Sequence, residues 1–218
     1  SNMNTDFARR QMIKQQVRAW DVLDENVLEV LNEVARECFV PPGFESLAFA
    51  DTEIPIGHGQ FMMTPTIEGR VLQALGLIGG EKVLEIGTGS GFLTACLATL
   101  ASHVTSVDLY DDFLDSARLA LQAADIENVD LLQMDAMKEL PDGTFDAIAV
   151  TGSIQTFDPR FTEKLAPGGR LFVVVGNAPA MIATRVLCVD GEEVIHESLF
   201  ETELQPLING ALPPQFSF

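Results

Sequence analysis

The chain has 218 residues, of which 47% are hydrophobic and 21% charged, and 13 basic and 32 acidic side chains give it a net charge of −19. This length and composition predict one globular domain with a sizeable core. Nucleic-acid binding needs clustered Lys and Arg, so the acidic balance argues against it. No apolar run reaches the roughly 18 residues of a membrane span, and the amino-terminal segment lacks a signal-peptide core. We therefore expect a cytoplasmic protein without a nucleic-acid or membrane partner.

The first third of the chain is expected to be mainly helical. Residues 5–19 are polar and basic with apolar residues at helical spacing, and a helix over 24–34 can be capped by the aspartate that begins it. Proline and glycine predict an irregular segment over 50–63. Thr64 can then cap a helix over 65–75, which has proline at its first position.

From residue 82 onward, expected strands alternate with expected helices. The strands are 82–86, 103–108, 129–134, 145–151 and 170–176, and the helices are 91–100, 111–124 and 158–166. Such alternation predicts an α/β fold with a parallel, doubly wound sheet. Asp190-Gly191 lies between two further expected strands, 183–189 and 193–200, and is a strong hairpin signal. The sheet is therefore expected to finish with antiparallel strands.

The most informative segment is 83–91, which reads Val-Leu-Glu-Ile-Gly-Thr-Gly-Ser-Gly. Here a buried strand leads into three glycines at alternate positions and then into a helix. Glycine permits positive φ and close approach of the backbone to a ligand, and the free N–H groups of a helix N-terminus favour an electron-rich partner. The loop formed by Gly87, Thr88, Gly89, Ser90 and Gly91 is therefore a candidate cofactor-binding site.

The residues around the glycines distinguish between cofactors. A dinucleotide fingerprint needs a glycine at position 92, which is Phe92, and a phosphate-binding P-loop needs a following lysine, which is absent. Glu85 would repel a pyrophosphate but can receive an amino-bearing or cationic ligand. S-adenosylmethionine fits, because it carries an amino group and a sulfonium and no phosphate. The alternative is a glycine-rich turn in some other α/β protein.

Acidic residues follow the next two expected strands. Asp108 lies 21 residues after Gly87, where an acid typically accepts hydrogen bonds from ribose hydroxyls. Asp135 follows the third strand and can either accept from an adenine amino group or cap a helix before Met137. Ligands of doubly wound sheets bind at the carboxyl ends of the strands, so we place the glycine loop, Asp108, Met134-Asp135-Ala136 and Thr151-Gly152 on one rim. Leu109 and Ala136 are further cofactor-binding candidates.

Cysteine and histidine point to no further chemistry. Cys38, Cys96 and Cys188 are odd in number and match no metal or redox spacing. Cys96 and Cys188 lie in apolar stretches and are expected to be small buried side chains, and such cysteine usage is typical of a reduced compartment. The histidines are isolated, so we expect no bound metal.

Three segments resemble class I S-adenosylmethionine-dependent methyltransferases: 83–91, 145–151 and 165–171. Residues 36–43, Arg-Glu-Cys-Phe-Val-Pro-Pro-Gly, and 53–60, Glu-Ile-Pro-Ile-Gly-His-Gly-Gln, are similar to protein-L-isoaspartate O-methyltransferases in particular. The resemblance covers nearly the whole chain. It implies a Rossmann-like, doubly wound, mostly parallel seven-stranded sheet with N-terminal helices and an antiparallel C-terminal hairpin.

The resemblance also implies a single methyltransferase domain over 1–218. Its parts would be an N-terminal helical and substrate-side region (3–80), a cofactor-binding core (81–176) and C-terminal antiparallel strands (177–218). The implied cofactor is S-adenosyl-L-methionine, converted to S-adenosyl-L-homocysteine. The implied substrate is a protein or peptide with isoaspartyl residues, methylated on the carboxyl group in protein repair. The oligomeric state is left open.

The chain departs from the family pattern Gly-Gln-Thr-Ile-Ser-x-Pro, because it reads Gly-Gln-Phe-Met-Met-Thr-Pro over 59–65. The resemblance assigns Gln60 and Met63 to the cofactor side, and Met63 stands where the family has a functional serine beside the transferring methyl. Thr64 is a candidate for the missing hydroxyl and equally a helix cap. Two alternatives therefore stay open: a methyltransferase for a more apolar small-molecule acceptor, and a cofactor-binding module without turnover.

Overall fold

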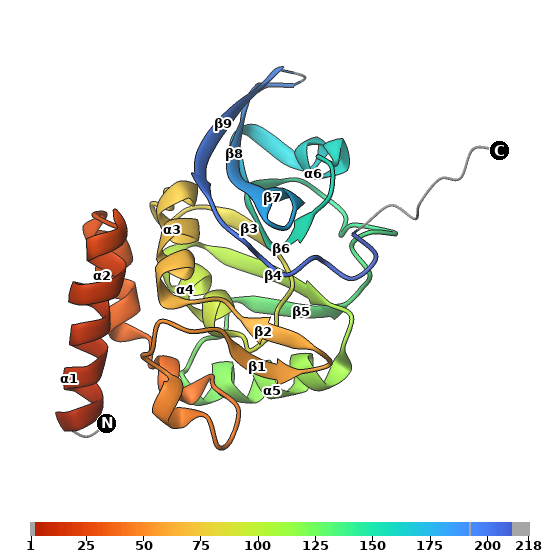
Figure 1. Cartoon of the computed structure of the whole chain (residues 1–218). Helices are drawn as coiled ribbons and strands as arrows, with labels where there is room; N and C mark the ends of the chain where they lie inside the picture. Colours follow the sequence, from red (N-terminus) through yellow and green to blue (C-terminus); the bar gives the residue numbers. More distant parts are fainter. Residues whose placement is uncertain (1–2, 192, 211–218) are drawn as a thin grey trace.

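The computed structural model describes residues 3–191 and 193–210 (Figure 1). Its helical elements are α1 (Met3–Met12), the π-helical turn η1 (Ile13–Val17), the 3₁₀ turns η2 (Arg18–Trp20), η3 (Arg36–Cys38) and η4 (Glu45–Leu47), α2 (Glu25–Glu33), α3 (Pro65–Leu75), α4 (Phe92–Leu100), α5 (Asp111–Ala123) and α6 (Pro159–Glu163). Its strands are β1 (Ile54–Gly57), β2 (Gln60–Met62), β3 (Lys82–Ile86), β4 (His103–Asp108), β5 (Val129–Gln133), β6 (Phe145–Ile154), β7 (Leu165–Asn177), β8 (Ala180–Asp190) and β9 (Glu193–Glu201).

Seven of these strands form one sheet in the order β5-β4-β3-β6-β7-β8-β9. The pairs from β5 to β7 are parallel, and β8 and β9 are added antiparallel. This confirms the doubly wound, mostly parallel sheet with an antiparallel C-terminal hairpin. The chain order reverses between β3 and β6, which is where ligands bind in such sheets.

The sheet is covered on both faces. Val83 and Leu84, neighbours on β3, are both fully buried but belong to two different hydrophobic clusters, as expected for side chains that alternate across a strand. The first cluster contains the buried residues of α2, α3 and α4, and the second contains Phe161 of α6. Figure 1 shows α3 and α4 on one side of the sheet and α6 on the other. The ends of the central strands are therefore held between two packed layers, which gives a rigid base to a site at this edge of the sheet.

The predicted helix caps are present. The Asp24 carboxylate accepts hydrogen bonds from the backbone N–H groups of Asn26 and Val27, at 2.9 and 3.4 Å, at the start of α2. The Thr64 hydroxyl accepts from the N–H of Ile67 at 3.5 Å at the start of α3. Cys96 and Cys188 are buried as expected, whereas Cys38 is exposed. None of the described helices is long and apolar enough to cross a membrane.

The prediction of an irregular segment over 50–63 is wrong in its second half. Strands β1 and β2 form an antiparallel hairpin there, and its turn has positive φ at His58 (53°) and Gly59 (70°). Two successive positive-φ residues match the twist of a tight hairpin. Pro55 and the neighbouring glycines concealed the strands, because a two-stranded edge sheet tolerates residues that a central strand does not.

The element boundaries around α6 also differ from the prediction. The helix expected over 158–166 ends at Glu163, and β7 already begins at Leu165 rather than at residue 170. Leu165 pairs with Phe145 of β6 before a register shift. The strand therefore starts ahead of the Pro-Gly-Gly segment that suggested a loop, because sheet pairing overrides the local turn preference.

Candidate functional site

A cavity of about 770 Å³, counting its open mouth, lies at the carboxyl ends of β3, β4, β5 and β6. The β1–β2 hairpin and residues 204–208, which we call the strap, also line it. The sequence-predicted residues that line it are Gln60, Gly87, Gly89, Asp108, Leu109, Met134, Asp135, Ala136, Thr151 and Gly152. Segments far apart in sequence therefore meet on the predicted rim.

Gly87 is required by the packing at the end of β3. Its φ is +97°, and a Cβ at this position would lie 2.1 Å from the Thr151 hydroxyl oxygen. That hydroxyl donates to the carbonyl oxygens of Ile86 and Gly87, at 2.8 and 3.0 Å. Thr151 thus fixes the start of the glycine loop from the neighbouring strand β6, and a side chain on residue 87 would displace it.

Asp108 is tied directly to the glycine loop. Its Oδ2 accepts from the Gly89 N–H at 2.9 Å and its Oδ1 accepts from the Tyr110 N–H at 3.2 Å. Burial raises the pKa of this carboxyl, although its backbone hydrogen bonds act in the opposite direction. Each oxygen keeps a lone pair for a further donor, so the carboxylate can receive hydroxyl groups from a ligand in the cavity.

A second, smaller cavity of about 360 Å³ shares Gly87 and Gly89 with the first. The other predicted residues that line it are Met63, Glu85, Thr88 and Ser90. Gly91 and Thr64 line neither cavity. Gly91 begins α4 and packs against Ala117, where a Cβ on residue 91 would approach the Ala117 Cβ to 2.9 Å.

Glu85 is fully buried at the wall of this smaller cavity. Its Oε1 accepts from the Ser106 hydroxyl at 2.6 Å and from the Thr94 hydroxyl, while its Oε2 is buried without a hydrogen-bond partner. Burial raises the pKa of Glu85 to about 8, and the carboxylates of Asp108 and Glu68 add to the effect. A buried acceptor without a partner is costly, so this oxygen is suited to a donor supplied by a ligand.

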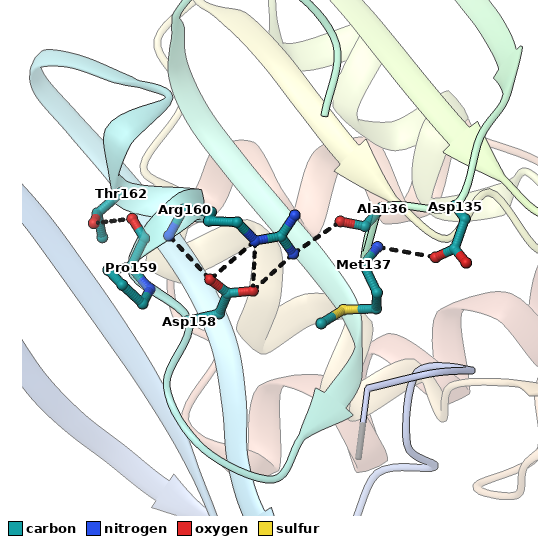
Figure 2. A network of polar contacts seen from close by, with 7 residues as sticks. All are labelled: Asp135, Ala136, Met137, Asp158, Pro159, Arg160 and Thr162. Atoms are coloured by element: carbon teal, nitrogen blue, oxygen red, sulfur yellow. Dashed lines mark hydrogen bonds and ion pairs between the residues drawn. The ribbon is translucent and has the colours of Figure 1, made fainter. Parts of the chain in front are cut away.

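Figure 2 shows how the wall after β5 is held. The Asp135 Oδ1 accepts from the Met137 N–H at 2.9 Å, but residues 136–138 form a turn and no helix begins there, so Asp135 holds a turn and the expected helix cap is wrong. Arg160 binds the Asp158 carboxylate through Nε and Nη2, and its Nη2 also donates to the Ala136 carbonyl at 3.1 Å. The α6 N-terminus thus supports the backbone that lines the cavity. The spacing of these residues in the sequence gave no indication of this contact.

Arg36 organises the segment that precedes α3. It is completely buried, with Nε 3.0 Å from the Glu68 carboxylate and Nη2 2.9 Å from the Met63 carbonyl oxygen, and Nη1 donates to the Ala48 carbonyl. Glu68 and Met63 both line the smaller cavity. Sequence reasoning missed this pair, because a buried ion pair joins residues 32 positions apart and leaves no periodic pattern.

The hairpin and the strap, which both line the cavity, are joined to each other and to the sheet. The Gln205 amide donates to the Gly59 carbonyl across 146 residues of sequence. The strap is tied to β6, because Ser153 N–H donates to the Gln205 carbonyl and Leu207 N–H to the Ser153 carbonyl, both at 2.9 Å. At the hairpin turn, the His58 ring stacks on Tyr110 with the centroids 3.9 Å apart.

Comparisons with known proteins agree with this architecture. The family model for protein-L-isoaspartate(D-aspartate) O-methyltransferase matches residues 8–210. A Rhodopseudomonas palustris (strain HaA2) protein named protein-L-isoaspartate O-methyltransferase 1 is 38% identical over 208 residues, which cover 94% of this chain and 85% of the relative. An Anaeromyxobacter dehalogenans (strain 2CP-C) protein-L-isoaspartate O-methyltransferase is 41% identical over 197 residues, covering 88% and 93%.

A solved structure shows the same fold. It is a Plasmodium falciparum protein described as a protein-L-isoaspartate O-methyltransferase, in complex with S-adenosyl-L-homocysteine. The TM-score is 0.76 at 18% identity, and the match covers 91% of this chain and 97% of the solved one. The family model spans most of the chain, and the bacterial relatives exceed one-third identity over nearly all of it. The chain therefore belongs to the protein-L-isoaspartate(D-aspartate) O-methyltransferase family.

Proposed function

We propose that the protein transfers the methyl group of S-adenosyl-L-methionine to the carboxylate of isoaspartyl residues in proteins, as a repair enzyme. Family membership supports this function, and relatives over most of the chain carry the name of that activity. The strongest support for this function within the site is the Oε2 of Glu85, which has no hydrogen-bond partner and lies beside the glycine loop. This oxygen suits a ligand that has an amino group and no phosphate.

We assign the cofactor to both cavities, which meet at Gly87 and Gly89. Glu85 would receive the amino group, Asp108 the ribose hydroxyls, and Asp135 the adenine side. The backbone of the glycine loop would approach the cofactor closely. The remaining residues assigned to this site are Gln60, Met63, Thr88, Ser90, Leu109 and Ala136, whereas Gly91, which lines neither cavity, would act only by holding the end of the glycine loop.

The cofactor supplies an electrophilic methyl group when bound, and the residues of this chain align the acceptor and exclude water. A carboxylate acceptor is already ionised at neutral pH, so no general base is required. The apolar side chains of Phe61, Met62 and Met63 line the smaller cavity and can shield the reacting atoms. Thr64 is the remaining hydroxyl candidate of this segment, but its oxygen already caps α3.

The lack of a hydroxyl at Met63 is expected to slow the reaction. Losing one hydrogen bond that orients the carboxylate costs about 1–3 kcal/mol, which corresponds to roughly 5–150-fold in rate. We propose that the enzyme works as one domain over 1–218 and in the cytoplasm, in line with its cysteine usage. The proposed partner is an isoaspartyl protein or peptide.

Incubation with methyl-labelled cofactor and an isoaspartyl peptide tests the function. We expect a base-labile methyl ester on the isoaspartyl peptide and none on the matched aspartyl peptide. Met63→Ser should increase kcat/KM for the isoaspartyl peptide, because serine can orient the acceptor carboxylate. No ester with either the wild type or Met63→Ser would overturn the isoaspartyl assignment.

A second candidate function is methyl transfer to a more apolar small-molecule acceptor. Phe61 favours it, because this side chain is 47% exposed and lines both cavities. A screen of cell extracts for a methylated small molecule would test it, and transfer confined to isoaspartyl peptides would exclude it. Detectable turnover on any acceptor would also exclude a module that binds cofactor without catalysis.

A further inference from the structure

The described residues that line the cavity include acidic but no basic side chains. The acidic side chains that line its two parts are Glu53, Asp108, Asp135, Glu68 and Glu85, of which Glu85 has a pKa raised to about 8, and no lysine or arginine lines either part within residues 3–191 and 193–210. The two arginines that support its walls are already engaged. Arg36 pairs with Glu68. Arg160 pairs with Asp158, as Figure 2 shows. An anionic acceptor therefore meets no free counter-charge from the described lining residues.

Four of the five carboxylates have partners within the fold. Backbone N–H groups bind Asp108, the Met137 N–H and the Asn209 amide bind Asp135, Arg36 pairs with Glu68, and two hydroxyls bind one oxygen of Glu85. Each of these four carboxyl groups therefore already has a role, because it either holds part of the fold or belongs to the assigned cofactor site.

Glu53 is different from the other four. Its side chain makes no hydrogen bond or ion pair within the described part of the chain, yet it lines the large cavity just before β1. Glu53 is exposed to solvent, and desolvation by the cavity wall raises the pKa of its carboxyl. It lines this cavity together with the hairpin residues Ile56, Gln60 and Phe61. Its carboxylate is therefore available to a group that enters from the acceptor side.

We propose that Glu53 is a specificity-determining residue that favours acceptors with a lysine, an arginine or a free amino group next to the isoaspartyl residue. The inference rests on the proposed function. The acceptor carboxylate is repelled by the acidic lining, and a neighbouring cation on the same peptide offsets that repulsion by pairing with Glu53. Opposite charges a few ångströms apart attract each other, and at an exposed side chain such as Glu53 this attraction is moderate.

The effect is expected to be moderate and sensitive to salt. Ion pairs that remain partly exposed change affinity by up to about five-fold, and added salt screens them. The preference for a basic peptide over its acidic counterpart is larger, because the acidic peptide adds a repulsion to the lost attraction. We expect about ten-fold in kcat/KM between these two at low ionic strength.

The test uses the full-length enzyme and three isoaspartyl peptides that differ only in the residues on either side of the isoaspartyl: lysine, alanine or glutamate. The wild type should prefer them in that order. Glu53→Gln should reduce the lysine-to-glutamate ratio of kcat/KM by about five-fold, and Glu53→Lys should invert the preference. The matched control Glu33→Gln changes an exposed acid that lines neither cavity, and should keep the wild-type ratio.

The outcomes separate this inference from the function on which it rests. An unchanged lysine-to-glutamate ratio in Glu53→Gln, or a wild type without preference, would overturn the role of Glu53 while isoaspartyl methylation stands. A loss of the ratio in Glu33→Gln as well would show that overall charge sets the preference and would also overturn it. Absence of methylation on all three peptides would instead contradict the proposed function.

Discussion

The two walls of the cavity are built in different ways. The strand-end wall consists of backbone at the ends of adjacent parallel strands, where the Thr151 hydroxyl donates to the Gly87 carbonyl and Asp108 accepts from the Gly89 N–H. The hairpin and the strap come from opposite ends of the chain and meet through the Gln205–Gly59 contact. The sheet thus holds the first wall, while the second depends on a few long-range contacts. This difference suggests that cofactor binding is fixed by the fold and that acceptor choice is adjustable.

The largest expected effect comes from breaking the strand-end wall with Gly87→Ala. The added methyl group would collide with the Thr151 hydroxyl at a backbone φ of +97°, so we expect a loss of about 3 kcal/mol or more in unfolding free energy and no measurable cofactor binding. Denaturant unfolding and calorimetric titration with S-adenosyl-L-homocysteine measure both.

Gly79→Ala is the matched control, because Gly79 also has positive φ (+122°) but nothing lies within 4 Å of its added Cβ. Its unfolding free energy should fall only by the smaller amount that alanine costs in this backbone conformation, and it should bind S-adenosyl-L-homocysteine normally. Equal losses in both variants would show that backbone strain, rather than the contact with Thr151, determines the requirement for glycine.

The next largest effect is expected on cofactor affinity, when Glu85, the buried acid of the same wall, is changed. Glu85→Gln removes the assigned partner of the cofactor amino group, and breaking a buried charge pair costs about 2–5 kcal/mol, or thirty-fold and more in affinity. We expect such a rise in the Kd for S-adenosyl-L-methionine at pH 7.5, measured by calorimetry. An unchanged Kd would remove Glu85 from the cofactor site.

The same substitution should stabilise the protein without cofactor at high pH. The pKa of Glu85 is raised in the folded state to about 8 from 4.5, so its favourable contribution is complete below pH 4.5 and is lost as the pH rises to about 8. Glu85→Gln should flatten the fall in Tm over that range and raise Tm at pH 8. A Tm profile parallel to that of the wild type would contradict the raised pKa.

The smallest effect is expected at the second wall. Gln205→Ala removes the amide that joins the strap to the hairpin, a neutral hydrogen bond worth about 0.5–1.5 kcal/mol. We expect a two- to ten-fold rise in the acceptor KM with a much smaller change in cofactor Kd, measured by steady-state kinetics and calorimetry. Gln122→Ala, at an exposed position outside both cavities, is the control. A larger effect on cofactor Kd than on acceptor KM would contradict the division between the walls.

The same two walls mark what the sequence could predict. Strand β3 begins and ends where predicted, and the glycines, Asp108 and Asp135 meet on the predicted rim, because short-range patterns encode a strand, a glycine loop and the acid after the next strand. Parallel strand order then brings these loops together. The cofactor wall was therefore largely predictable without the structure.

The acceptor wall, formed by the hairpin and the strap, was not predictable from the sequence. The β1–β2 hairpin was expected to be irregular, and neither the Arg36–Glu68 pair nor the Gln205–Gly59 contact has a local sequence pattern. These contacts depend on how distant segments pack, which periodicity does not record. Glu53 is likewise one acid among 32 in the sequence, and only its position on the cavity wall makes it a candidate for acceptor recognition.

The most direct test of the assigned site is a crystal structure of the protein with S-adenosyl-L-homocysteine. It should show the ligand across both cavities, with its amino group bonded to the Oε2 of Glu85, its ribose hydroxyls bonded to Asp108 and its sulfur facing Met63. A ligand bound elsewhere, or one that leaves the Oε2 of Glu85 without a partner, would contradict the account of how this fold holds the methyl donor.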